Sequence, residues 1–344
     1  MHHLRFGPRS QPMERNCFGM DALFPARQFY VWLQWNIAAV LFAAGLANPV
    51  MADMQVNRCL NIGNALDAPF EGAWGPGITE QDLDWIAGAG FDTIRLPVRF
   101  GSHWNGKIWP GFLTRVEQVV AQARDRGLTV ILDLHHFDDL MSDPDGFAPV
   151  FVAIWSELAD RFEGHDDRLV FELLNEPRGA VTTARALELY QSVLPIIRRK
   201  HPNRWIILGG GNMNSLDEML TLPSLGPRIA LTFHYYNPVR FTHQQLQWTE
   251  EYFPPSSWGL PSEIATVNAD MARAARSDVP VLLGEFGVVR EADTASRNAW
   301  IQTVRMAAEG HGISWCYWAY GAGFDVRDFT GYEWYPGLYR ALME

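Results

Sequence analysis

Thr129-Val130-Ile131-Leu132-Asp133-Leu134-His135-His136 is an almost continuous apolar run that ends in polar side chains. A strand buried on both faces of a parallel sheet has this composition. The segment before it, 112–126, carries apolar residues at spacings of three and four, which predicts an amphipathic helix that stops at Gly127. The stretch therefore predicts a helix followed by a buried parallel strand, with polar groups at the strand's carboxyl end.

The same alternation continues in both directions along the chain. Strands are predicted at 57–63, 92–97, 128–134, 169–175, 204–210, 228–235, 279–285 and 312–318. Amphipathic helices are predicted at 79–89, 112–126, 148–163, 181–200, 262–277 and 293–309. Eight strands that alternate with helices imply βαβ units, and their simplest closure is an α/β fold with a single (β/α)8 TIM barrel. The fifth unit is weak, because Gly209-Gly210-Gly211 leads into only a short helix candidate.

The first 52 residues differ in composition from the rest. Arginines precede an apolar run from Phe29 to Leu46, and Val50-Met51-Ala52 then places small residues where a signal peptidase cleaves. Gln34-Trp35-Asn36 interrupts the apolar run, which weighs against an uncleaved membrane anchor. We predict a signal peptide with its upstream n-region at 1–52, a folded domain at 53–344, and a secreted protein, extracellular or periplasmic, that does not contact the membrane after cleavage.

Charge and composition narrow the range of partners. The 344-residue chain has a formal net charge of −11, which repels phosphate backbones and excludes nucleic acid as the expected partner. Its 14 tryptophans could stack on sugar rings, although composition alone favours a Trp-rich core as their explanation. A monomer is expected.

Two cysteines fall on strands that a closed barrel would make neighbours. Cys59 lies on the first predicted strand and Cys316 on the last. In an oxidising compartment they could form a disulfide, but two buried free thiols fit the sequence equally well.

Polar, titratable and aromatic residues recur where the predicted strands end. These residues are Arg95, His135, His136, Asn175, Glu176, His234, Tyr236, Glu285 and Trp318. Active sites of (β/α)8 barrels lie at the carboxyl ends of the strands, so these side chains are expected to converge. Neighbours on a strand face opposite sides, so His135 is expected to point inward, and His136 could point away from the cleft and only support it.

Two of these residues, Glu176 and Glu285, are carboxylates on opposite sides of the predicted barrel mouth. Glycoside hydrolysis needs two carboxylates that flank the scissile bond, and in retaining enzymes the two carboxyl groups lie about 5–5.5 Å apart. The acid needs a raised pKa while the nucleophile stays ionised, and Arg95 could keep a neighbouring glutamate ionised. The pair therefore predicts a glycosidase.

Several motifs resemble glycoside hydrolase family 5. Leu174-Asn175-Glu176-Pro177 and Leu283-Gly284-Glu285-Phe286-Gly287 look like its acid/base and nucleophile motifs. The resemblance continues, in family order, through Asn61-Ile62-Gly63-Asn64-Ala65-Leu66, Ile94-Arg95-Leu96-Pro97, Asp133-Leu134-His135-His136, His234-Tyr235-Tyr236-Asn237-Pro238 and Tyr317-Trp318-Ala319-Tyr320. It spans roughly residues 56–342. The segments Asn61–Trp74 and Phe241–Gln244 resemble those of bacterial endoglucanases, some of which also accept β-mannans.

The resemblance implies a catalytic domain at 53–344 and a role for each matching position. Glu176 would be the acid/base and Glu285 the nucleophile. Asn175 would bind the sugar 2-hydroxyl, Arg95 and Tyr236 would orient Glu285, and His234 would lie beside the acid/base. Further contacts with sugar would come from His135, His136, Asn64, Asp67, Trp318 as the floor under the attacked sugar, and Trp248 on the leaving-group side. Relatives are expected to have Glu where this chain has Asp67, whose side chain is shorter.

The implied activity is a retaining endo-β-1,4-glucanase that acts on cellulose or mixed-linkage β-glucan without a cofactor or metal, since two carboxylates suffice for the chemistry. An endo-β-1,4-mannanase, or a glucanase that also cuts mannan, would use the same mechanism. A metal-dependent hydrolase is an alternative hypothesis. The metal-ligand spacings His-x-His and His-Glu-x-x-His do not occur in the chain. The alternative outside enzymes is a sugar-binding protein that has lost catalysis.

Overall fold

A computed structural model describes residues 54–249 and 251–344. Within them, eight parallel strands close into a barrel in the order β1 to β8, and β1 pairs with β8. The barrel strands are β1 Arg58–Asn61, β2 Thr93–Val98, β3 Thr129–Leu134, β4 Leu169–Glu172, β5 Ile206–Gly209, β6 Ile229–Tyr235, β7 Val281–Phe286 and β8 Ser314–Tyr317. The predicted (β/α)8 barrel is confirmed, and each of the eight predicted strands overlaps an observed one.

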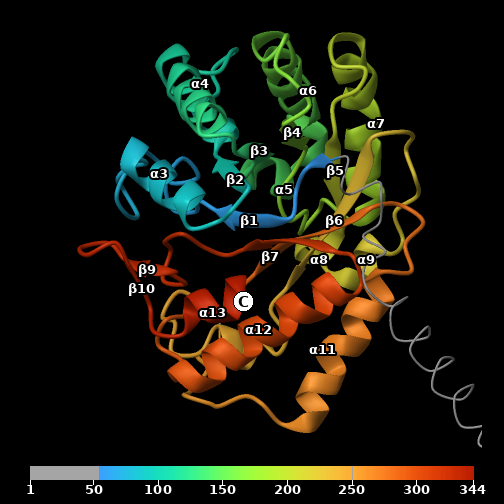
Figure 1. Ribbon diagram of the computed structural model, residues 1–344. Coiled ribbons are helices and arrows are strands. Elements are labelled where there is room, and N and C mark those ends of the chain that lie inside the picture. The colour runs from blue at the N-terminus through green and yellow to red at the C-terminus, as the bar shows by residue number, and fades with distance from the viewer. Residues whose placement is uncertain (1–53, 250) are drawn as a thin grey trace, which may run out of the picture. The chain divides into compact units, whose positions relative to one another are not determined.

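Helices lie outside the strands (Figure 1). The long helices are α3 Glu80–Gly88, α4 Pro110–Asp125, α6 Pro144–Arg161, α7 Thr183–Lys200, α11 Pro261–Ala274 and α12 Thr294–Gly310. The short elements are η1 Phe100–His103, α5 Asp138–Ser142, α8 Gly211–Asn214, α9 Leu216–Met219, α10 Val239–Thr242, α13 Leu338–Met343 and the antiparallel pair β9 Arg327–Asp328 and β10 Glu333–Trp334. The weak fifth unit is thus two four-residue elements: α8, which has non-helical φ and ψ angles at Asn212 and Met213, and the helix α9.

Local sequence explains where these helices begin and end. Thr79 and Asp82 form a capping box at the start of α3, and the Thr182 side chain caps α7. Gly127 has a φ of 75° just after α4, the left-handed conformation that glycine adopts most readily.

The interior of the barrel changes character along each strand. Near the amino ends of the strands, inward side chains form an apolar cluster that includes Cys59, Ile131, Val170, Leu282 and Cys316. Outward residues join a second, larger cluster beneath the helices. Nearer the carboxyl ends, the inward positions are polar, and these polar positions build the site described below.

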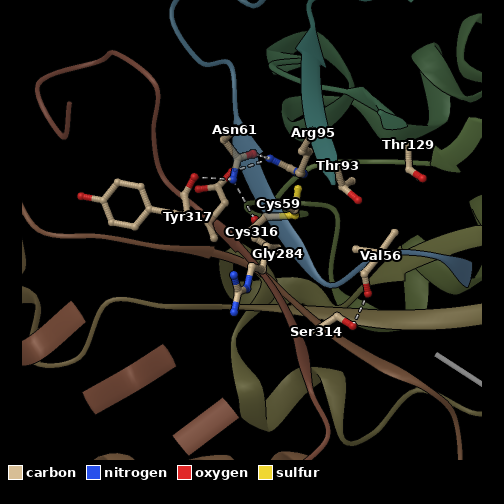
Figure 2. Close-up of a disulfide and its surroundings, with 12 residues drawn as sticks. Val56, Cys59, Asn61, Thr93, Arg95, Thr129, Gly284, Ser314, Cys316 and Tyr317 are labelled. Atoms are coloured by element: carbon tan, nitrogen blue, oxygen red, sulfur yellow. Dashed lines mark hydrogen bonds and ion pairs between the residues drawn. A yellow bond between two sulfur atoms is a disulfide. The ribbon is translucent and has the colours of Figure 1, made fainter. Parts of the chain in front are cut away.

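A disulfide joins Cys59 of β1 to Cys316 of β8, across the seam where the barrel closes (Figure 2). Both residues are fully buried. Toward the mouth from the disulfide, the Asn61 amide donates to the carbonyls of Gly284 and Tyr317. Of the two alternatives that the sequence left open, a disulfide and two free thiols, the structure contains the disulfide.

The predicted signal segment, 1–52, lies outside the described residues. Among the residues that are described, no helix is long and apolar enough to cross a membrane.

Candidate active site

A cleft of about 980 Å³ opens at the carboxyl ends of the strands. Ten of the twelve predicted site residues line it: Asn64, Asp67, His135, His136, Glu176, His234, Tyr236, Trp248, Glu285 and Trp318. The other two, Arg95 and Asn175, are buried, and Arg95 donates hydrogen bonds to both Glu285 and Asn175. The residues predicted from separate strand ends therefore converge on one cleft.

Glu176 and Glu285 approach each other in this cleft. Glu285 lies in β7, where the register with both neighbouring strands shifts, and Glu176 follows β4 with a φ of 45°. His234 Nδ1 lies 2.9 Å from Glu176 Oε1 and 3.5 Å from Glu285 Oε2. These three groups each offer an atom within 4.8 Å of the others. The spacing is closer to the roughly 5–5.5 Å of retaining glycosidases than to the wider gap of inverting ones.

Arg95 is the buried cation under the pair. Its guanidinium donates to Glu285 Oε1 at 2.8 Å and forms a bidentate pair with Glu172 at 2.7 and 2.8 Å. It also donates to the amide oxygens of Asn61 and Asn175, at 2.9 and 2.8 Å. One fully buried guanidinium therefore fixes the nucleophile candidate and the residue that precedes the acid candidate.

Asp133 completes this network and lies 3.1 Å from Arg95. Its other contact is His135 Nδ1, at 2.5 Å. Sequence reasoning did not single out Asn61, Asp133 or Glu172 as site residues. The available signal was their position, since each interrupts an apolar strand on the inward face shared with the predicted site residues.

Burial raises the pKa of Glu176 to about 7, and the nearby Arg178 and Arg95 oppose this rise. Burial also raises the pKa of Glu285 to about 7, opposed by His234, Arg95 and the Tyr236 hydroxyl. That hydroxyl donates to Glu285 Oε2 at 2.9 Å. Glu285 has direct donors from both Arg95 and Tyr236, and these two hydrogen bonds favour the ionised form of Glu285.

His135 and His136 both line the cleft, so the expectation that His136 could point away is wrong. Strand alternation does not apply here, because β3 ends at Leu134 and His136 has a φ of 30°. The rings of the two histidines meet edge to face, with centroids 4.5 Å apart.

Trp318 forms a flat wall of the cleft. Its ring is nearly parallel to that of His135, at an interplanar angle of 6° and a centroid distance of 5.8 Å. Behind it, a side chain added at Gly63 would lie 2.7 Å from the Trp318 ring, so only glycine fits there. The indole is therefore held in a fixed position, as a stacking platform requires.

Asp67 lines the cleft, but its carboxylate is engaged by the backbone. Its two oxygens accept the N–H groups of Asn64, at 3.1 Å, and Ala65, at 2.8 Å. These bonds hold Asn64 in a left-handed turn with a φ of 64°. The shorter side chain thus organises the loop, and sugar binding by Asp67 stays a prediction.

The rim of the cleft carries exposed aromatic side chains. Trp248 is 68% exposed and meets the His243 ring edge-on. Trp74 is 45% exposed and packs its edge against His136, at a centroid distance of 5.8 Å. Trp74 was not among the predicted site residues, although it ends a motif that carries the family resemblance.

Among residues 54–249 and 251–344, two groups of side chains have donor atoms close enough together to hold a metal ion. They are Asp67, His135 and His136, and the trio Glu176, His234 and Glu285. In the first group, Asp133 already engages His135 Nδ1 and the backbone engages Asp67. An ion in the second group would occupy the carboxylate oxygens that two-carboxylate hydrolysis requires.

A (β/α)8 barrel whose mouth holds two closely spaced glutamates and a flat indole is the arrangement expected of a glycoside hydrolase. A family model described as cellulase, glycosyl hydrolase family 5, matches residues 61–323. The chain therefore belongs to glycosyl hydrolase family 5.

Individual relatives agree with this membership. Endoglucanase H of Acetivibrio thermocellus is 35% identical over 270 residues, and the match covers 76% of this chain but only 29% of that longer protein. Endoglucanase B of Ruminococcus albus is 30% identical over 312 residues, covering 80% of this chain and 75% of that one.

Solved structures are similar as well. A hyperthermophilic endo-beta-1,4-glucanase in complex with substrate has a TM-score of 0.83 and 35% identity, and covers 86% of this chain and 98% of its own. Cel5A of Thermotoga maritima, in complex with mannotriose, has a TM-score of 0.82 and 34% identity, and covers 86% of this chain and 100% of its own.

Proposed function

We propose that this protein is a retaining endo-β-1,4-glucanase, with Glu176 as acid/base and Glu285 as nucleophile. The observation that carries the proposal is the pair itself: one oxygen of each carboxylate within 4.8 Å, with Arg95 and Tyr236 both bound to only one of them. Relatives named as endoglucanases support β-1,4-glucan as the substrate.

The reaction proceeds in two displacements. Ionised Glu285 attacks the anomeric carbon while Glu176 donates its proton to the leaving glycosidic oxygen. The bond between the anomeric carbon and the glycosidic oxygen breaks in this step. A water molecule then gives a proton to Glu176, and its oxygen attacks the same carbon and releases Glu285. Two inversions give net retention of configuration.

The surrounding residues would orient the sugar. Asn175, held by Arg95, would bind the 2-hydroxyl, and Trp318 would stack under the attacked ring. His135, His136, Asn64 and Trp248 would contact hydroxyls or rings along the cleft. Arg95 and Tyr236 would keep Glu285 ionised and aligned, and His234 would hold Glu176. Residues 1–52 would direct the chain to the periplasm or the cell exterior, where it would act as a monomer.

Product formation from carboxymethylcellulose, barley β-glucan, glucomannan and galactomannan tests the proposal. Wild type should cut both glucans, and Glu176→Ala and Glu285→Ala should each lose that activity. Glu163→Ala is the matched control, because Glu163 pairs with Lys200 on the outside of the barrel. Activity on galactomannan alone would overturn the substrate but keep the mechanism.

Rescue of activity by azide distinguishes the acid/base from the nucleophile. With an activated aryl cellobioside, azide should rescue Glu176→Ala and give a β-glycosyl azide, because the intermediate on Glu285 still forms. Azide should rescue Glu285→Ala with the opposite, α, configuration, because it replaces the nucleophile. Exchanged stereochemistry in the two variants would reverse the assignment.

A further inference from the structure

Three consecutive residues after β5 have left-handed backbone conformations. Asn212, Met213 and Asn214 have φ values of 50°, 57° and 54°. Residues other than glycine visit this region singly, because the Cβ atom crowds the following carbonyl. A strained run of this kind persists only where the surroundings enforce it, and such strain clusters at functional sites.

The glycines before the turn make it possible. A Cβ atom at Gly209 would collide with the Asn214 side chain, and one at Gly210 would lie 2.8 Å from the Glu218 backbone. A Cβ atom at Gly211 would lie 2.8 Å from the Thr183 nitrogen. The run Gly209-Gly210-Gly211 therefore lets the turn press against β5, against α9 and against the start of α7.

The turn makes two contacts behind the acid/base candidate. Met213 N–H donates to the carbonyl of Pro177, the residue after Glu176, at 3.0 Å. The Asn214 amide nitrogen lies 3.3 Å from His234 Nε2, and the opposite ring nitrogen of His234 faces Glu176. Asn214 is fully buried, and among the described residues its amide oxygen has no hydrogen-bond partner.

We propose that Asn214 is a positioning residue that sets the tautomer of His234 and thereby the location of the catalytic proton on Glu176. The amide donates to Nε2, which must then be unprotonated, so Nδ1 carries the hydrogen and donates to Glu176 Oε1. With Oε1 accepting, the acidic proton of Glu176 resides on Oε2, ready for the leaving oxygen. This inference deepens the proposed function and rests on it.

The charges around His234 are compatible with a neutral ring. It faces Glu176, Glu285, Glu172, Arg95 and His135. Burial lowers the pKa of His234 to about 4, with Glu285 and Glu172 opposing and Arg95 reinforcing the decrease. Near neutral pH the imidazole is therefore uncharged, and its tautomer matters.

Asn214→Asp is the sharpest variant, because it keeps the shape of the side chain and turns a donor into an acceptor. Nε2 would then be protonated, and the imidazolium favoured by the carboxylate would lower the pKa of Glu176. We expect the alkaline limb of the pH profile of kcat/KM to move down by about one unit. Activity on cello-oligosaccharides should fall by about 10²-fold, while glycosylation by 2,4-dinitrophenyl cellobioside, which needs no acid, is retained.

Asn214→Gly is the matched control, since glycine adopts the left-handed turn without strain but removes the amide. It should lose up to about tenfold on cello-oligosaccharides, the scale of one hydrogen bond, with the alkaline limb unmoved. A merely structural role predicts equal losses on both substrates in both variants. That result, or a wild-type pH profile and substrate ratio for Asn214→Asp, would overturn the proposal.

Nitrogen-15 NMR of the His234 ring reports the tautomer in the wild-type protein and does not depend on the folding of either Asn214 variant. The proposal requires the Nδ1–H tautomer at neutral pH, with the signal assigned by comparison with His234→Gln. Detection of the Nε2–H tautomer would reject it. Absence of any glycan hydrolysis by wild type would instead reject the proposed function, so the two failures are distinguishable.

Discussion

The base and the mouth of the barrel interior lie two residues apart on the same strands, yet they differ completely in chemistry. Cys59 is followed on the inward face by Asn61, Ile131 by Asp133, and Val170 by Glu172. At the base, apolar contacts and a disulfide hold the strands together. At the mouth, buried charges around one arginine hold them. We therefore expect changes at the base to affect stability alone, and changes to the buried charges at the mouth to affect both stability and chemistry.

The mouth depends most heavily on Arg95, so Arg95→Met should have the largest effect. The change leaves Asp133, Glu172 and Glu285 buried without their cation. We expect the free energy of unfolding to fall by about 3–5 kcal/mol, as when one partner of a buried ion pair is removed. Urea unfolding measures this fall, and glucan hydrolysis by the remaining folded protein should be lost.

Arg327→Met is the matched control. Arg327 is equally buried and pairs with Asp82, but neither residue lines the catalytic cleft. Its loss should destabilise the protein while leaving kcat of the folded fraction unchanged. An Arg95→Met variant as stable as wild type would show that the mouth is held by packing, as the base is.

The disulfide is the corresponding test of the base. Cys59→Ala with Cys316→Ala removes a link between residues 257 positions apart in the sequence. We expect a loss of about 2–4 kcal/mol in the free energy of unfolding, mainly because the unfolded chain gains freedom. Thermal melting of the double variant beside wild type measures it, and kcat on β-glucan should be unchanged. A fall in kcat without a fall in melting temperature would mean that base and mouth are coupled.

The base was easier to predict from sequence than the mouth. Apolar runs located all eight strands, because strands buried on both faces admit few polar residues. Glu176 and Glu285 stood out because they follow such runs or end them. Asp133 and Glu172 lie within the predicted strands. The sequence pointed to Arg95 as the cation beside Glu285, but it did not show that the same guanidinium also pairs with these two buried carboxylates.

Backbone conformation was the second obstacle at the mouth. The alternation rule failed at His136 because the chain has already left β3. The left-handed turn at Asn212–Asn214 was visible only as a glycine run that weakened the fifth helix. Sequence patterns report regular elements, whereas part of this site is built from residues that depart from them.

The smallest expected effect is a gain in the free energy of unfolding, whereas the two changes above lower it. It measures how much the buried Glu176 carboxylate destabilises the fold at high pH. Burial raises the pKa of Glu176 from an ordinary value of 4.5 to about 7, so the folded state binds its proton more tightly than the unfolded state. The resulting stability is fully present below pH 4.5 and is lost as the pH rises to about 7. Glu176→Gln, which is neutral at every pH, should therefore be more stable than wild type at pH 8 by about 1–2 kcal/mol. This gain is less than the full shift implies, because a side chain that is 25% exposed keeps part of its hydration.

Urea unfolding at pH 4, 6 and 8 checks the sign. The advantage of Glu176→Gln should be greatest at pH 8 and should vanish at pH 4, where Glu176 is protonated in both the folded and the unfolded state. Glu163→Gln on the barrel exterior, paired with Lys200, should show no such gain. If Glu176→Gln were instead less stable at pH 8, the ionised carboxylate would be stabilising the fold. Glutamate at position 176 would then favour both catalysis and stability.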